Sequence, residues 1–234
     1  MCSPTITWRS ENQMSNWLAV LLSFIYVFAV LGIAEGLRRA FQLPVAFTRK
    51  VVHISVGMWA WGTAALFTDK WHAIIPPAAF IVLNYISHRR ALFTAMELSD
   101  KSNLGTVYFP LAFLVIILLF FEVSKGFMVA ALMPMTWGDA FAATIGRRYG
   151  RRQYAIFGAR RSIEGSTAML LCSLISVFVT LLAFGTPLGS ALAAGLVLAL
   201  LATLAEAVSP FGLDNLLVPA SSALGYVLLS GLLH

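Results

Sequence analysis

Long apolar runs separated by short polar segments make up most of the chain. A helix rises about 1.5 Å per residue, so about 20 apolar residues cross the roughly 30 Å hydrocarbon core of a bilayer. The pattern predicts an all-α fold: one membrane domain, residues 1–234, with an N-terminal tail at residues 1–16 and about eight transmembrane helices, or seven if one run is re-entrant. The runs are approximately Trp17–Ala34, Val51–Phe67, Trp71–Ser87, Gly105–Phe121, Gly126–Gly146, Ser166–Phe184, Leu188–Val208 and Asn215–Leu233.

Composition supports a membrane protein and leaves no room for a separate soluble domain. Hydrophobic residues are 59% of the chain, charged residues are 11%, and the mean hydropathy is +0.84. These values lie outside the usual balance of soluble proteins. The first apolar run lacks a basic segment before it and a small-residue cleavage site after it, so we interpret it as a retained span. Cys2 and Cys172 form neither a metal-ligand spacing nor a disulfide framework.

Lysines and arginines alternate along the predicted connections. All but three of the 16 lie in the first, third and fifth connections. Cytoplasmic loops carry an excess of positive charge, so these connections are predicted to face the cytoplasm, with both termini on the other side. The net charge of +6 is spread over three short loops that would face anionic lipid headgroups. Membrane lipids are therefore the expected partners, and nucleic acid is not.

Ionisable residues gather on the predicted cytoplasmic side. Asp139 lies inside the fifth run, where an ionised side chain costs roughly 2.5–3.5 kcal/mol on insertion scales, so its presence needs a reason. Gly138 and small alanines around it would let a backbone or a ligand approach closely. A buried carboxylate paired with a neighbouring arginine is the alternative interpretation. His53, Glu206 and Asp214 lie at the ends of other runs on the same side, so any chemistry is expected there.

The connection at residues 147–165 is the most basic segment, and its residue types suit phosphate binding. Arginine presents forked donors, and glycine lets backbone N–H groups close on phosphate oxygens. Enforcing topology and holding headgroups are the alternative roles. Asp139 beside this segment favours a polyphosphate carried on Mg²⁺, which needs both cations and a carboxylate. The segment and its flanks hold Arg147, Arg148, Arg151, Arg152, Arg160, Arg161, Gly146, Gly150, Gly158, Gly165, Ser162 and Ser166.

No soluble nucleotide motif of the GxxxxGK[ST] or GxGxxG type is present. The chain instead resembles the family of CTP-dependent lipid-alcohol kinases, which includes dolichol, phytol and farnesol kinases and the CTP-using diacylglycerol kinase, with the phosphatidate cytidylyltransferases as distant relatives. The resemblance runs from about Arg49 to Pro219. It rests on Arg49-Lys50-x-x-His53, Gly105 to Pro110, Gly138-Asp139 to Gly146-Arg147-Arg148-Tyr149-Gly150, Arg161-Ser162-x-Glu164-Gly165-Ser166, and Glu206 with Asp214-Asn215 and Pro219.

The resemblance implies transfer of the γ-phosphoryl group of CTP to an isoprenoid alcohol. Asp139 would hold Mg²⁺, with Glu206 or Asp214 completing the metal shell. Arg49 and Lys50 would cover the transferring group, and His53 or a carboxylate, Glu164 among the candidates, would accept the proton. Glu164 is alternatively a second ligand or the partner of an arginine, and His53 a packing residue. The nucleotide would be held by Gly138, Gly146, Arg147, Arg148, Gly150, Arg160, Arg161, Ser162, Gly165, Ser166, Asp214 and Asn215.

Two further points concern substrate and alternatives. Arg161 stands where the family is expected to have lysine, which keeps the charge but not the compact ammonium. Trp59, Trp61, Phe109 and Phe113 are candidates to line a groove for the lipid tail, although ordinary packing is the alternative. The short chain favours phytol, geranylgeraniol or a short polyprenol over dolichol. A cytidylyltransferase that releases pyrophosphate and a non-enzymatic carrier of anionic lipids are the competing functions, and the oligomeric state stays open.

Overall fold

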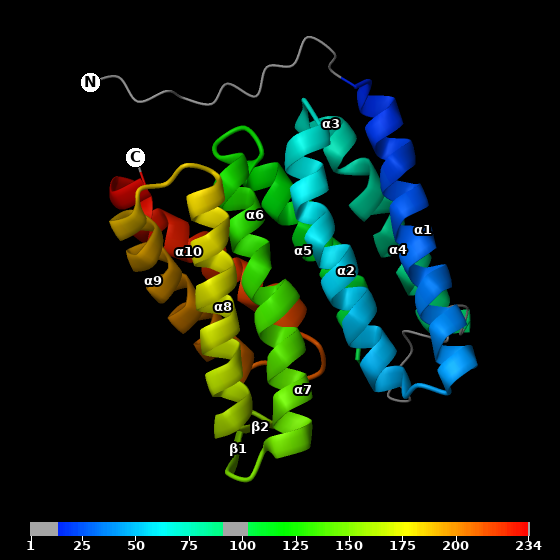
Figure 1. The fold of residues 1–234 in the computed structure, drawn as a ribbon, viewed down its shortest axis with the longest axis vertical. Coiled ribbons are helices and arrows are strands. Elements are labelled where there is room, and N and C mark those ends of the chain that lie inside the picture. The colour runs from blue at the N-terminus through cyan, green and yellow to red at the C-terminus, as the bar shows by residue number, and fades with distance from the viewer. Residues whose placement is uncertain (1–13, 91–102, 234) are drawn as a thin grey trace.

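The computed structural model describes residues 14–90 and 103–233. Residues 1–13 of the predicted tail at 1–16, and Lys101 of the third connection, lie outside that part. Figure 1 shows a bundle of helices with a small hairpin at one end. The helices are α1 (Asn16–Phe41), α2 (Val45–Leu66), α3 (Lys70–Ala73), α4 (Ile75–Arg90), α5 (Gly105–Phe120), α6 (Lys125–Met133), the π-helix η1 (Pro134–Gly138), α7 (Asp139–Tyr149), α8 (Ile163–Ala183), α9 (Leu188–Ala207) and α10 (Asp214–Leu233).

Helices occupy all eight apolar runs, so the predicted all-α fold is confirmed. The third run is divided between the single turn α3 and the longer α4, and the fifth is built from α6, η1 and α7 in direct succession. Helix α2 begins at Val45, before the charged pair Arg49 and Lys50, so these two side chains lie within the helix.

The bundle has the surface of a membrane protein. Among the described residues, four helical segments are long and apolar enough to cross a bilayer: Asn16–Phe41, Lys125–Tyr149, Ile163–Ala183 and Leu188–Ala207. Helix α5 is apolar but shorter. Large apolar side chains on the outer faces, such as Leu21 and Ile25 of α1 and Ile175 of α8, are more than half exposed. Lipid rather than water suits such a surface.

The centre of the bundle is α6, which Figure 1 shows between α2 and α8. Every residue from Gly126 to Met133 is buried. Small residues allow close approach around this helix and η1. A Cβ atom on Gly57 would lie 2.4 Å from the Thr136 side chain, and one on Gly138 would lie 2.2 Å from Oγ of Ser173. The tight packing fixes the position of the residue that follows η1, Asp139.

A β-hairpin fills much of the segment that was expected to be an irregular basic loop. Strands β1 (Gln153–Ile156) and β2 (Ala159–Ser162) are antiparallel. The two turn residues, Phe157 and Gly158, both have positive φ, at 48° and 83°. This conformation matches a two-residue hairpin turn with the twist that strands favour. In addition, α7 continues to Tyr149, so the predicted loop is helical at its start.

Candidate active site

A π-turn places Asp139 in the interior of the bundle. The backbone N–H of Asp139 donates to the carbonyl of Pro134, five residues back, in place of the usual four. The residue is only 5% exposed. Its carboxylate Oδ2 lies 2.6 Å from Nζ of Lys50, which is contributed by α2. The alternative interpretation held that Asp139 is a buried partner for a neighbouring arginine. Asp139 is indeed buried and paired, but its partner is a lysine 89 residues away in sequence.

His53 lies one turn after Lys50 on the same face of α2. Its Nε2 is 2.7 Å from the carbonyl oxygen of Met135 and 3.6 Å from Oδ2 of Asp139. A carbonyl oxygen only accepts hydrogen bonds, so Nε2 must carry the proton and Nδ1 is the ring nitrogen left to accept one. The ring also packs against Phe109, with centroids 4.6 Å apart. His53 is therefore fixed in orientation as well as near the carboxylate.

Arg161 joins the other two acidic residues. Its Nε lies 2.6 Å from Oε1 of Glu206, and one terminal nitrogen lies 3.2 Å from Oδ2 of Asp214. The same side chain donates to the carbonyl oxygen of Ser209 at 2.9 Å. The planar guanidinium can make several such bonds at once, which a lysine ammonium cannot match in geometry. In this structure the residue predicted to hold phosphate organises the carboxylates.

The Asp139–Lys50 pair and the Arg161–Glu206–Asp214 group lie close enough to form one charged centre. Arg161 and Lys50 both interact electrostatically with Asp139, and the carboxylates of Glu206 and Asp214 interact with Asp139 as well. Arg49 is close enough to Asp139 and Asp214 to interact electrostatically with both. Residues from α2, α7, β2, α9 and α10 are thus brought together at the end of the bundle that carries the hairpin in Figure 1.

Asn215 connects this centre to the start of α5. Its Nδ2 donates to the carbonyl of Gly105 at 3.0 Å, and the Gly105 N–H donates to Oδ1 of Asn103 at 3.0 Å. A Cβ atom on Gly105 would lie 2.9–3.1 Å from the side chains of Asn103, Asn215 and Arg49. Glycine is therefore needed here because three polar side chains converge on the backbone.

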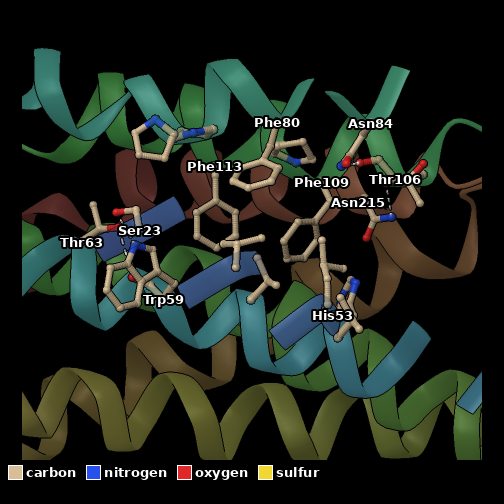
Figure 2. A pocket seen from close by; sticks show the side chains of 18 of the residues that line it. Ser23, His53, Trp59, Thr63, Phe80, Asn84, Thr106, Phe109, Phe113 and Asn215 are labelled. Atoms are coloured by element: carbon tan, nitrogen blue, oxygen red, sulfur yellow. Dashed lines mark hydrogen bonds between the residues drawn. The ribbon is translucent and has the colours of Figure 1, made fainter. Parts of the chain in front are cut away.

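An apolar groove leads away from the charged centre, between α1, α2, α4 and α5. Its empty space is about 900 Å³, which includes open solvent, so the groove is only partly enclosed. In Figure 2, His53 and Asn215 lie at one end of the groove, and Trp59, Ser23 and Thr63 lie at the other. The predicted lining residues Trp59, Phe109 and Phe113 do line it. Trp61 does not, because it packs against Phe184 of the α8–α9 connection.

The glycines predicted to bind the nucleotide serve close packing between α7 and α8. A Cβ atom on Gly165 would lie 3.0 Å from the carbonyl oxygen of Ala142, and one on Gly150 would lie 2.7 Å from Oγ of Ser162, the residue that caps α8. Ser162 caps α8 through the N–H of Gly165, at 3.1 Å. Ser166 bonds the hydroxyl of Tyr154, at 2.6 Å. These residues hold the hairpin and helix ends against each other, beside the charged centre.

Glu164 and the remaining arginines lie outside the charged centre. The Glu164 carboxylate accepts the N–H groups of Arg151 and Arg152, at 3.2 Å and 3.4 Å, and so ties down the chain between α7 and β1. The side chains of Arg147, Arg148 and Arg160 are exposed. Arg147 is nonetheless close enough to Arg49 for electrostatic interaction. Of the four arginines predicted to hold the triphosphate, Arg161 is the one whose side chain pairs with carboxylates within residues 14–90 and 103–233.

Asn84 of α4 is a site residue that the sequence analysis missed. Its Nδ2 donates to the carbonyl of Thr106 at 2.7 Å, and it lines the groove near Asn215 in Figure 2. Its Oδ1 is buried and has no hydrogen-bond partner among residues 14–90 and 103–233. An amide inside a predicted apolar span was the available signal, because a buried polar group needs a partner.

The carboxylates fit a Mg²⁺–nucleotide better than a metal held by protein alone. No three His, Cys, Asp or Glu side chains of the described ranges are grouped closely enough to hold a metal ion. Mg²⁺ is commonly bound by one or two carboxylates together with substrate phosphates and water. Oε2 of Glu206 is buried and has no hydrogen-bond partner in the same ranges, so it is available as a ligand beside Asp139. The donor set fits that mode.

Fold and site together define a helical membrane protein in which a buried charged centre opens into an apolar groove. No protein-family model and no solved structure match the chain. Curated relatives do. The phytol kinase of Synechocystis sp. is 34% identical over 210 residues, covering 89% of this chain and 90% of the relative. A probable chloroplastic phytol kinase 1 of Oryza sativa is 28% identical, covering 91% and 74%, and a probable phytol kinase 2 of Glycine max is 27% identical, covering 84% and 70%. The chain belongs to the phytol kinase family.

Proposed function

We propose that this protein is a lipid-alcohol kinase that transfers the γ-phosphoryl group of CTP to a membrane-dissolved isoprenoid alcohol of the phytol or geranylgeraniol type, giving the lipid monophosphate and CDP. The observation that carries the proposal is the junction of charged centre and groove, because Arg49, His53 and Asn215 line the groove and also border the carboxylates. An apolar alcohol can reach the charged groups there without leaving the bilayer.

Names of the relatives support an alcohol such as phytol as the acceptor. The choice of CTP rests on the resemblance of the segments at residues 138–150 and 161–166 to CTP-dependent kinases. The alternation of positive charge supports a site that faces the cytoplasm, because the first, third and fifth connections carry all but three of the 16 lysines and arginines.

Phosphoryl transfer depends mainly on positioning and on neutralising negative charge. The alcohol oxygen attacks the γ-phosphorus, the bond from that phosphorus to the oxygen bridging it to the β-phosphate breaks, and CDP leaves. Arg49 and Lys50 lie on α2 beside Asp139, where they can stabilise the charge of the phosphates. Nδ1 of His53 is free of the Met135 carbonyl and is the proposed acceptor of the alcohol proton.

Asp139, with Glu206 or Asp214, would hold Mg²⁺ on the nucleotide. The ion, when bound, would offset the negative charge of the phosphates and so favour attack by the hydroxyl. For that binding mode Lys50 must exchange its bond to Asp139 for one to a phosphate oxygen. The 2.6 Å ion pair with Lys50 holds the Asp139 carboxylate in place.

A transfer assay tests the proposal. The purified full-length protein in detergent receives γ-labelled CTP, ATP or GTP together with phytol, geranylgeraniol, undecaprenol or diacylglycerol, and labelled lipid and product nucleotide are measured. The expected result is labelled phytyl or geranylgeranyl phosphate with CDP, formed fastest from CTP. The Asp139→Asn variant should lose this activity.

Two results would contradict the proposal. Release of pyrophosphate in place of CDP would indicate a cytidylyltransferase. Absence of labelled lipid from a folded preparation with every donor and acceptor would remove the kinase function altogether. Folding of that preparation is checked by its thermal transition, so that an inactive protein is not confused with an unfolded one.

A further inference from the structure

The two ends of the apolar groove differ in whether their polar atoms already have partners. At the end near the charged centre, Oδ1 of Asn84 and Oδ1 of Asn215 are buried and have no hydrogen-bond partner within residues 14–90 and 103–233. Both are acceptors, and a buried acceptor without a partner is costly unless a ligand supplies a donor. A hydroxyl group entering this end would supply one.

At the opposite end every labelled polar group is satisfied within the protein. Nε1 of Trp59 donates to Oγ of Ser23 at 3.0 Å, and that hydroxyl donates to the carbonyl of Ala19 at 2.8 Å. The hydroxyl of Thr63 donates to the carbonyl of Trp59 at 3.1 Å. Figure 2 shows these three side chains grouped at the end away from His53. This end offers only apolar surface to a ligand.

From this difference we infer that the groove binds the isoprenoid alcohol in one direction, with its hydroxyl at Asn84 and Asn215, and that Trp59 is the end wall which limits the length of the tail. The inference rests on the proposed function and deepens it, because it assigns a residue to substrate choice. The length of the substrate tail is then limited by one side chain rather than by the bilayer.

Trp59 is held too firmly to move aside for a longer tail. Besides the bond to Ser23, its ring stacks on Tyr26 with centroids 4.6 Å apart and planes at 23°. The hydroxyl of Tyr26 is itself fixed by the carbonyl of Ser55, at 2.7 Å. Ser23 is fully buried. A side chain constrained on two sides by α1 acts as a rigid wall, because displacing it breaks a hydrogen bond and an aromatic contact together.

The spacing along α2 gives the groove its length. His53, Val56 and Trp59 are three residues apart and share one helical face. The lining residues of α2 run from Arg49 to Thr63, which is about 21 Å at a rise of 1.5 Å per residue. Thr63 and Ala73 line the groove at the same end as Trp59. Truncating Trp59 therefore enlarges this end of the groove, whereas enlarging Val56 narrows the groove one turn closer to His53.

Trp61 provides a matched control. It is two residues from Trp59 on the same helix, and its ring packs against Phe184, 5.2 Å between centroids, away from the groove. The same substitution, Trp→Leu, can be made at both positions. Loss of a large aromatic side chain from α2 is then common to both variants, and only one of them changes the groove.

The experiment is a competition assay with the full-length protein and an equimolar mixture of farnesol, geranylgeraniol and a longer polyprenol. Trp59→Leu should raise kcat/KM for the longer alcohol relative to geranylgeraniol by about tenfold, the size typical of a pocket that gains or loses one small group. Val56→Phe should shift the ratio toward farnesol. Trp61→Leu should keep the wild-type ratio, whatever its effect on total activity.

A second measurement does not require catalysis. The thermal transition of each variant is recorded with each alcohol and no nucleotide, and the alcohol that stabilises most should become longer in Trp59→Leu and shorter in Val56→Phe. This measurement separates the proposed kinase function from the inference about tail length. If the wild-type protein forms no lipid phosphate, the proposed function fails, but binding of alcohols in the groove is still tested.

An unchanged order of alcohols in both Trp59→Leu and Val56→Phe would overturn the inference. So would an equal change in Trp61→Leu, since that would show a general effect of loosening α2. Absence of stabilisation by any alcohol in the wild-type protein would show that the groove does not hold the tail.

Discussion

Aspartate and histidine occur together at both ends of the bundle, with opposite consequences. At the α3 end, Asp69 bonds the ring of His72 at 2.8 Å, three residues away, and both side chains are about one-third exposed. At the hairpin end, Oδ2 of Asp139 lies 3.6 Å from Nε2 of His53, and their side chains are 8% and 10% exposed. The first pair forms within one helical turn. The second is assembled from helices far apart in sequence.

The Asp69 group is explained by local structure. Its carboxylate accepts the N–H of His72 and so caps α3, and Asn16 donates to it at 2.6 Å, which joins α1 to this turn. Capping and exposed pairs of this kind stabilise by roughly 1 kcal/mol. The Asp139 group is buried and joins α2 to α7, where the cost of desolvating the ions offsets what the pair contributes. A buried charged group of this kind is what the proposed chemistry at the hairpin end requires.

The largest expected difference is in catalysis. Asp139→Asn should lower kcat/KM for lipid phosphate formation by on the order of 1,000-fold, the upper range for loss of one electrostatic stabiliser. Asp69→Asn is the matched control and should stay within about twofold of wild type. Activity is measured as labelled lipid at equal amounts of folded protein. Comparable losses of activity in the two variants would show that the Asp139 end is no more important for catalysis than the Asp69 end.

His53→Gln should reduce kcat by about 100-fold, because a positioned general base typically contributes that much. The glutamine amide can still donate to the Met135 carbonyl, so the packing of α2 on η1 should persist. His72→Gln at the other end should leave kcat unchanged. An activity of His53→Gln equal to wild type would assign the proton to another group.

Arg161→Gln should destabilise the protein by about 3 kcal/mol, because Glu206 and Asp214 would lose their shared cation inside the bundle. Arg161→Lys should recover only part of this loss, since an ammonium cannot reproduce the forked contacts. Chemical unfolding in detergent measures both. Full recovery by lysine would mean that charge alone matters at this position.

The smallest expected effect is on the pH dependence of stability. The N–H of His72 lowers the pKa of Asp69 below its ordinary value of 3.8. A lowered pKa stabilises the fold above that ordinary value, and the contribution disappears as the pH falls through the folded-state pKa. Asp69→Asn should therefore reduce stability by less than about 1 kcal/mol at neutral pH, with the difference from wild type vanishing as the pH falls through the folded-state pKa of Asp69. A difference that grows in acid would have the wrong sign.

The sequence predicted the helices and the side of the bundle on which the polar residues meet, because apolar length and charge alternation are local signals. It did not predict how those residues pair. Lys50 and Asp139 are paired across 89 residues, and Arg161 holds carboxylates where phosphate was expected. Glu164 fits the pattern of a catalytic residue, but its carboxylate binds backbone N–H groups outside the charged centre.

Elements that the sequence analysis missed carry weak local signals. The hairpin has strands of only four residues each, and its turn lies in a segment whose many arginines favoured an irregular loop. Asn84 is a single amide in a long apolar run. In both cases the structure depends on contacts made after the helices assemble, which a pattern of periodicity does not contain.

The π-turn before Asp139 has a consequence for the phase of the helix. One residue more than an α-helical turn is accommodated between α6, buried throughout, and α7, which carries the carboxylate. Each residue turns an α-helix by about 100°, so the same residues wound as a regular α-helix would place Asp139 about that angle away from its present direction relative to α6. Lys50 and His53 would then face a different residue of the same helix, although the sequence of the site would be unchanged. The wide turn at Pro134–Gly138 therefore sets the direction of the Asp139 side chain, and tightening this turn would abolish the site without replacing any of its residues.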